Sequence, residues 1–155
     1  MKRFSFNLEA VLNHRILLED LEEQKLHKIL HSIHEVESLR TRMQKEAQEC
    51  RSLLHKPHPG EIDVHEMRQM VAYLQKLEQE IQQCAVLLAR LQEDRRVQSE
   101  KLVEARKKRE ILEKLKEKSF SSYQTELKGM EQKLLDELAT ERFGFADEQN
   151  LPGKK

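Results

Sequence analysis

The sequence has few residues that break helices: of its 155 residues, four are glycine and three are proline. It also has no tryptophan and only 5% aromatic residues. Its apolar share of 37% is below the roughly 45–50% of a typical globular domain. A two-helix coiled coil needs only about two apolar residues in seven. The composition therefore favours a coiled coil over a globular core.

Other features that the sequence lacks limit the classes of function that we expect for it. There is no run of about 18 apolar residues, so we expect no membrane-spanning helix and no direct membrane insertion. The 28 basic and 28 acidic residues cancel, which argues against strong binding to nucleic acid or to acidic lipid. The sequence contains no glycine-rich phosphate loop, nucleophile elbow or paired-cysteine zinc spacing. We therefore predict no enzymatic activity, no cofactor and no metal site.

The sequence does contain two long helical patterns separated by one strong break. Apolar residues recur at spacings of three and four for about 50 residues before the break and about 80 after it. The break, His55–Gly60, contains two prolines and a glycine, which favour a chain reversal. We predict an all-α fold: a long antiparallel two-helix coiled-coil hairpin with the second helix overhanging. The expected elements are a helix over residues 7–55, a turn over 56–62, a helix over 63–143 and a disordered tail over 146–155, with 1–145 as a single domain.

Local signals support both helix starts. Asn7 is a candidate N-cap of the first helix, and Asp63 with Glu66 forms a capping-box pattern at the start of the second. Within the helices, several polar residues fall at core positions. They are expected to weaken packing while fixing the register, or to mark where a third helix docks. These residues are Arg15, Glu19, Arg40, Arg95 and Gln98.

The two helices differ in length, which has a functional consequence. At about 1.5 Å per residue they span roughly 75 Å and roughly 120 Å. Folding at residues 57–60 aligns the amino terminus with residues near 112, so that about 30 later residues lack an intramolecular partner. Their apolar stripe predicts a partner-binding surface, and self-association or a fold-back is the alternative. The stripe consists of Phe120, Tyr123, Leu127, Met130 and Leu134.

Three other features receive ordinary structural interpretations. His27, His31 and His34 have a spacing that suits a metal, but surface histidines are common on helices. The basic run Arg106–Arg109 is flanked by glutamates and reads as a solvated helix face rather than a DNA-reading helix. Cys50 and Cys84 would lie about 16 residues apart along the hairpin, so we expect no disulfide and a cytoplasmic setting.

Two stretches of the sequence are characteristic of one protein family. The first is Phe4-Ser5-Phe6-Asn7-Leu8-Glu9-Ala10-Val11-Leu12, followed by Arg15. The second lies in the carboxy-terminal half and comprises Ala105–Arg109, Leu112–Lys116, Tyr123 and Glu131–Glu137. Both stretches resemble the FliJ family of flagellar type III export proteins. Together with the length and the central break, the resemblance covers essentially the whole chain.

The resemblance implies a long antiparallel coiled coil that acts as the central stalk of the export ATPase hexamer. Such proteins also contact the cytoplasmic domain of the export gate and escort export chaperones, in the cytoplasm at the inner membrane of the flagellar base. The end bearing both termini would enter the ring through Phe4, Phe6, Phe120, Tyr123, Leu127, Met130 and Leu134. The gate contact would fall on Met43, Cys50, Tyr73, Leu77 and Cys84. The competing interpretation is a self-associating coiled-coil scaffold.

Overall fold

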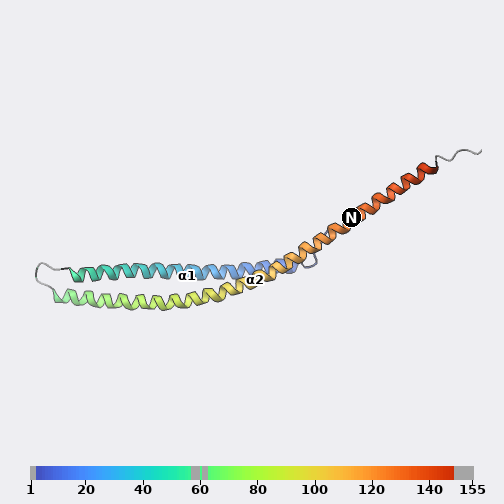
Figure 1. Cartoon of the computed structure of the whole chain (residues 1–155). Helices are drawn as coiled ribbons and strands as arrows, with labels where there is room; N and C mark the ends of the chain where they lie inside the picture. The colour runs from blue at the N-terminus through green and yellow to red at the C-terminus, as the bar shows by residue number, and fades with distance from the viewer. Residues whose placement is uncertain (1–2, 57–59, 61–62, 149–155) are drawn as a thin grey trace, which may run out of the picture. The chain divides into compact units, whose positions relative to one another are not determined.

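A computed structural model describes residues 3–56, 60 and 63–148, with side chains up to residue 141. It contains two helices, α1 (Glu9–His55) and α2 (Val64–Glu148) (Figure 1). Within the described residues there is no strand, and the predicted all-α helical hairpin is confirmed. α1 begins two residues after the expected start, and α2 continues five residues beyond the expected end at residue 143. Most of the predicted turn and residues 149–155 of the predicted tail lie outside the described residues.

The starts of the two helices differ in how well the sequence predicted them. The Asp63 carbonyl accepts a hydrogen bond from the Met67 amide at 3.1 Å, and its carboxylate accepts one from the His65 amide at 2.8 Å. Asp63 is therefore the N-cap of α2, as predicted. At α1 the Leu8 carbonyl accepts the first helical bond, from Leu12 at 2.9 Å. The predicted N-cap Asn7 is thus wrong by one residue, because the chain is still turning at Asn7 and Leu8.

The contacts group into two units, which we describe separately. The central unit is Ile16–Lys107, and the terminal unit combines Met1–Arg15 with Lys108–Lys155. The expectation of a single domain over residues 1–145 stays a prediction.

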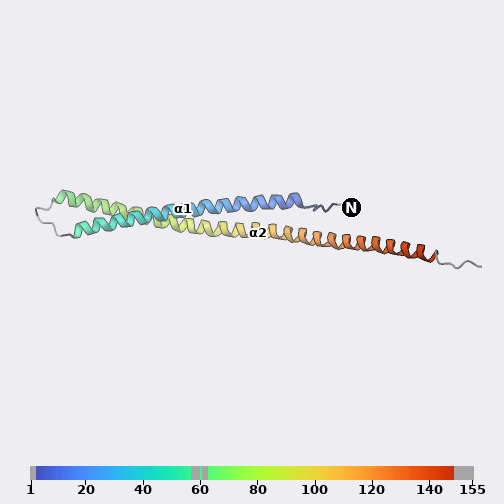
Figure 2. The ribbon, with the colours of Figure 1, turned by 90° about the horizontal axis from the view of Figure 1, so that it is seen from above.

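In the central unit α1 and α2 lie side by side in both views (Figures 1 and 2). Tyr73 donates to Glu46 at 2.8 Å, whereas Gln98 donates to the Glu22 backbone carbonyl at 3.1 Å. Residue numbers rise along one helix as they fall along the other, so the pair is antiparallel. Its core is an apolar cluster of Met43, Ala47, Leu77 and Cys84, against which Val36, Leu74 and Ile81 pack.

Polar residues interrupt this core at one end of the central unit. Glu19 and Gln98 are only 8% and 7% exposed. Gln98 also donates to the Glu22 carboxylate, and Arg106 Nε donates to Glu19 Oε1 at 3.2 Å. Each buried side chain thus has a partner on the opposite helix, which limits the cost of burial. This arrangement agrees with the predicted role in fixing the register.

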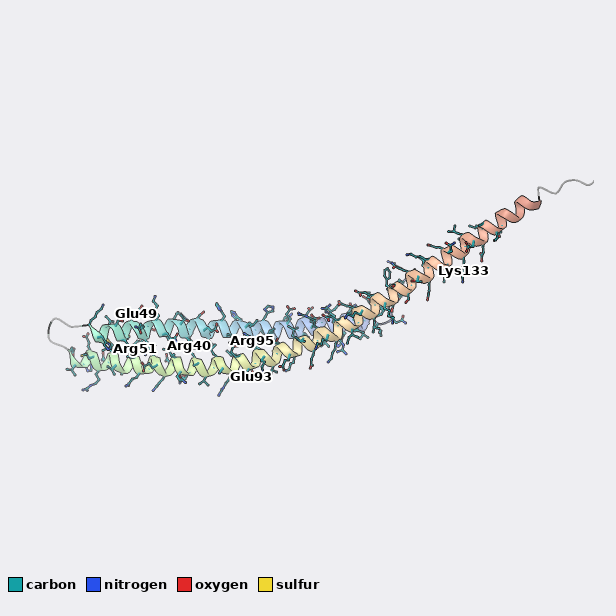
Figure 3. All side chains as sticks on the ribbon, in the orientation of Figure 1. Arg40, Glu49, Arg51, Glu93, Arg95 and Lys133 are labelled. Atoms are coloured by element: carbon teal, nitrogen blue, oxygen red, sulfur yellow. The ribbon has the colours of Figure 1, made fainter. Side chains whose placement is uncertain are left out.

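The remaining polar core predictions have mixed outcomes. Arg95 is exposed, so its predicted core position is wrong; a long charged side chain at the edge of a helix interface extends to water. Arg40 is half-buried, and its Nε atom is buried with no hydrogen-bond partner. Figure 3 labels both arginines on the ribbon. In the terminal unit, Arg15 is half-buried.

In the terminal unit, residues 3–8 precede α1 and lie against the part of α2 after residue 108. Leu12 is buried at 5% exposure, and the Lys116 ammonium pairs with the Glu9 carboxylate at 2.7 Å. Further along α2, every side chain from residue 128 to residue 141 is exposed. Within this unit, α2 therefore extends beyond the chain that covers it, as the overhang prediction requires.

Candidate functional site

An aromatic cluster forms the centre of the terminal unit. Phe120 and Tyr123 are three residues apart on α2 and therefore share one face of the helix. The Phe4 ring lies 5.1 Å from Phe120 in an edge-on arrangement and 5.5 Å from Tyr123. These centroid distances are typical of favourable aromatic pairs. The cluster fixes the segment before α1 onto α2.

This cluster corrects part of the sequence interpretation. The amino terminus was expected to align with residues near 112, which left Phe120 and Tyr123 without an intramolecular partner. Phe4 instead contacts both rings. The physical reason is that residues before Glu9 are not helical, and a non-helical residue advances up to about 3.3 Å whereas a helical one advances 1.5 Å. The segment therefore reaches further along α2 than a helix of the same residues.

Beside the aromatic cluster lies a groove of about 970 Å³. One wall is the amino-terminal segment, residues 3–8, and the other is one face of α2. Residues predicted as ring contacts line it, namely Phe4, Phe6, Tyr123, Leu127 and Met130. Sequence reasoning missed the flanking Leu8, Ser119, Ser122 and Glu126, which also line it. Ser119 and Glu126 could have been found, because each lies three or four positions from a stripe residue, whereas Ser122 does not.

From Met130 onward, at the end of the groove, the side chains of the apolar stripe are exposed to solvent. Met130 is 66% exposed and Leu134 is 60% exposed. Leu135 and Leu138 are also exposed, although neither was named as a contact. Five of the seven predicted ring contacts thus line one groove, Phe120 lies in the adjoining aromatic cluster, and Leu134 follows along α2. An exposed apolar surface of this kind is typical of a protein interaction site.

The five residues expected at the export gate do not form one surface. Met43, Leu77 and Cys84 are 4–9% exposed and belong to the core of the central unit. They pack α1 against α2 and have little surface to offer a partner. Cys50 is half-buried and Tyr73 is 42% exposed. Of the five residues, Cys50 and Tyr73 are therefore the ones with surface available to a partner.

Tyr73 carries the clearest electrostatic feature of that region. Its hydroxyl donates to the Glu46 carboxylate, which raises the pKa of Tyr73 above its usual value. Nearby, Arg51 pairs with Glu78 at 2.6 Å. Both contacts join α1 to α2 on the outside of the core. They therefore add polar links between the helices beside the apolar core.

Two of the three histidines with metal-like spacing, His27 and His31, lie near glutamates of their own helix. His31 lies 3.3 Å from Glu35 and His27 lies 3.9 Å from Glu23, each one helical turn away. Across the parts of the chain that the structure describes, no three histidine, cysteine or acidic side chains converge on a point. Over the same residues, neither helix has an apolar stretch long enough to cross a membrane.

Comparisons with known proteins give one match. A family model described as Flagellar FliJ protein matches residues 4–147. The match includes both stretches on which the sequence resemblance rests. The chain matches no curated protein and no solved structure at a significant level.

Proposed function

The chain belongs to the FliJ family and is a component of flagellar protein export, and we propose that it acts as the central stalk of the export ATPase ring. In this role it has no catalytic activity of its own. It promotes assembly of the ATPase hexamer, couples ATP turnover to the export gate and escorts export chaperones. It works in the cytoplasm, associated peripherally with the inner membrane at the flagellar base.

The exposed stripe of the terminal unit carries this proposal. Its apolar side chains protrude from one face of a single helix, while most residues on the other faces are charged or polar. A helix of this kind fits into a pore lined by loops of surrounding subunits, because apolar contacts form without deep pockets on either partner. The groove beside it offers further surface formed by residues 3–8.

A gate contact is proposed only for the exposed part of the predicted set. Tyr73 presents an aromatic ring whose hydroxyl is held by Glu46, and aromatic residues are enriched at protein interfaces. Cys50 is half-buried in the same region. We propose that this face of the central unit contacts the cytoplasmic domain of the export gate. Tyr73→Ala is expected to weaken binding to that domain while leaving ATPase binding unchanged.

The test of the ring contact is direct binding of the purified chain to the flagellar export ATPase. Leu127→Asp and Met130→Asp each place a charge in the stripe and are expected to abolish binding. The matched control is Ile111→Asp. Ile111 is 59% exposed on the same helix and lies on the opposite face from the stripe. It should bind like the unchanged chain.

Circular dichroism of all three variants checks that helicity is retained. Full binding by Leu127→Asp and Met130→Asp would exclude the stripe as the ring contact. Equal loss with Ile111→Asp would show that binding does not depend on this face of α2.

A further inference from the structure

The exposed part of α2 has the pattern of a short coiled coil of its own. Leu127 and Leu134 lie seven positions apart, and Met130 lies between them at the position that completes an apolar heptad. Glu126 and Lys133 each come directly before a core residue and therefore flank the stripe on one side. Glu131 follows Met130 and flanks the stripe on the other side. Figure 3 labels Lys133 on this part of α2.

These charges favour one way of pairing two copies of the helix. In an antiparallel pair, Leu127 of one copy lies opposite Met130 of the other, and the same contact repeats by symmetry. Glu126 then lies opposite Lys133 of the second copy, and Lys133 opposite its Glu126. Both flanking contacts join opposite charges.

The parallel pair has the opposite electrostatics. In a parallel coiled coil the residue before one core position faces the residue that follows a core position of the partner, five residues further along. Glu126 would then lie opposite Glu131 of the second copy, and the repulsion would occur twice. The charge pattern therefore disfavours the parallel pair and selects the antiparallel one.

The groove beside the stripe is compatible with this arrangement. It is lined by Leu127 and Met130 together with Phe6 and Leu8. A second helix lying along the stripe would cover these apolar side chains as well. The stripe itself is open to such a helix, since Met130 and Leu134 are 66% and 60% exposed.

We propose that the chain forms a reversible homodimer through antiparallel pairing of this segment of α2, residues 126–134. The interface is short and is expected to be weak, because isolated helical contacts of this length are marginal. Pairing uses the same side chains as the proposed ring contact, so a dimer cannot bind the ring through them. The homodimer is therefore a resting state of the free chain, and its existence does not depend on the proposed function.

The test is sedimentation equilibrium of the purified full chain, without the ATPase. The unchanged chain should show a concentration-dependent monomer–dimer equilibrium. Glu126→Lys and Lys133→Glu each turn both attractive contacts into repulsive ones and should each weaken the dimer by roughly tenfold or more. The double variant restores opposite charges and should dimerise like the unchanged chain. Lys128→Glu, which makes the same charge change on an exposed position away from the interface, is the control and should have no effect.

Three results would overturn the proposal. They are a chain that stays monomeric at every accessible concentration, single reversals that dimerise normally, or a double variant that is no better than the singles. Because the ATPase is absent, none of these results bears on ring binding. Conversely, a chain that dimerises as described but fails to bind the ATPase would leave this inference standing.

Discussion

Among individual residues, Glu22 shows how a half-buried charged side chain is accommodated beside the core of the helical pair. Lys25 on the same helix donates to the Glu22 carboxylate at 2.6 Å, and Gln98 donates from the opposite helix. These hydrogen bonds, that of Lys25 most, hold the pKa of Glu22 below its usual value of 4.5. Gln98 is buried and has Glu22 as its partner. The pair thus links a sequence feature, polar residues in the core, to a measurable dependence on pH.

The lowered pKa of Glu22 determines how its contribution to the free energy of unfolding depends on pH. The ionised carboxylate stabilises the folded chain above the unfolded pKa, and this stabilisation is lost as the pH falls through the lower folded pKa. Glu22→Gln should therefore destabilise the chain at about pH 7, and the difference from the unchanged chain should shrink at about pH 3.5. Urea unfolding of the unchanged chain and of Glu22→Gln at the two pH values measures this difference in the free energy of unfolding. An equal difference at the two pH values would contradict this explanation.

Phe4 provides a second prediction at this scale. Phe4→Ala removes its contacts with Phe120 and Tyr123, each worth about 0.5–1.5 kcal/mol beyond burial. The near-ultraviolet circular dichroism of Tyr123 should weaken, and residues 3–8 should become accessible to limited proteolysis. Phe4→Leu is the matched control, because it keeps apolar bulk without an aromatic ring and should protect the segment in part. Unchanged proteolysis of Phe4→Ala would show that the aromatic cluster does not hold the segment.

Among the elements, the exposed part of α2 contains a glycine that the fold does not require. Gly129 lies within the helix, and a methyl group added there would meet nothing within 4 Å. Glycine inside a helix costs about 1 kcal/mol relative to alanine. Gly129→Ala should therefore raise the helicity and thermal stability of the terminal unit, as measured by circular dichroism. Ala139→Gly on the same exposed stretch is the reverse control and should lower both by a similar amount.

The N-cap of α2 gives a further element-scale prediction. Asp63 accepts the His65 amide through its side chain, and replacing such a cap with alanine costs about 1 kcal/mol. Asp63→Ala should lower the free energy of unfolding by that amount, whereas Asp63→Asn, which keeps the acceptor oxygen, should be close to neutral. Equal losses for the two variants would show that the charge of Asp63, rather than its capping hydrogen bond, stabilises the helix.

The two helix starts also show what the sequence can and cannot predict. Asp63 was identified correctly because its signal is local: a capping residue, an acidic residue three positions later and an apolar pattern directly after it. Asn7 was misassigned because the path of residues 3–8 depends on Phe4 contacting rings more than 100 residues away. Local patterns carry no information on such a contact. The same contact explains why the amino-terminal segment reaches Phe120 and Tyr123 on α2, beyond the expected alignment with residues near 112.

At the scale of the whole molecule, periodicity and the single break were enough to predict two long helices. The apolar stripe predicted Tyr123, Leu127 and Met130 of the groove, because residues at spacings of three and four share a helix face. Of the five residues expected at the export gate, Met43, Leu77 and Cys84 belong to the core, and the gate contact itself stays a prediction. Core and contact residues are both apolar, so heptad spacing alone does not separate them. Burial against the opposite helix, which the structure shows, separates the core residues from the contact residues.

The most direct test of the account is the ATPase turnover of the flagellar export ATPase with and without the chain, with hexamers counted by electron microscopy. The account predicts stimulated turnover, more hexamers and density in the ring pore with the unchanged chain and with Ile111→Asp, but not with Met130→Asp. A chain that leaves turnover and hexamer number unchanged while forming a stable homodimer would contradict the stalk function and favour a self-associating scaffold.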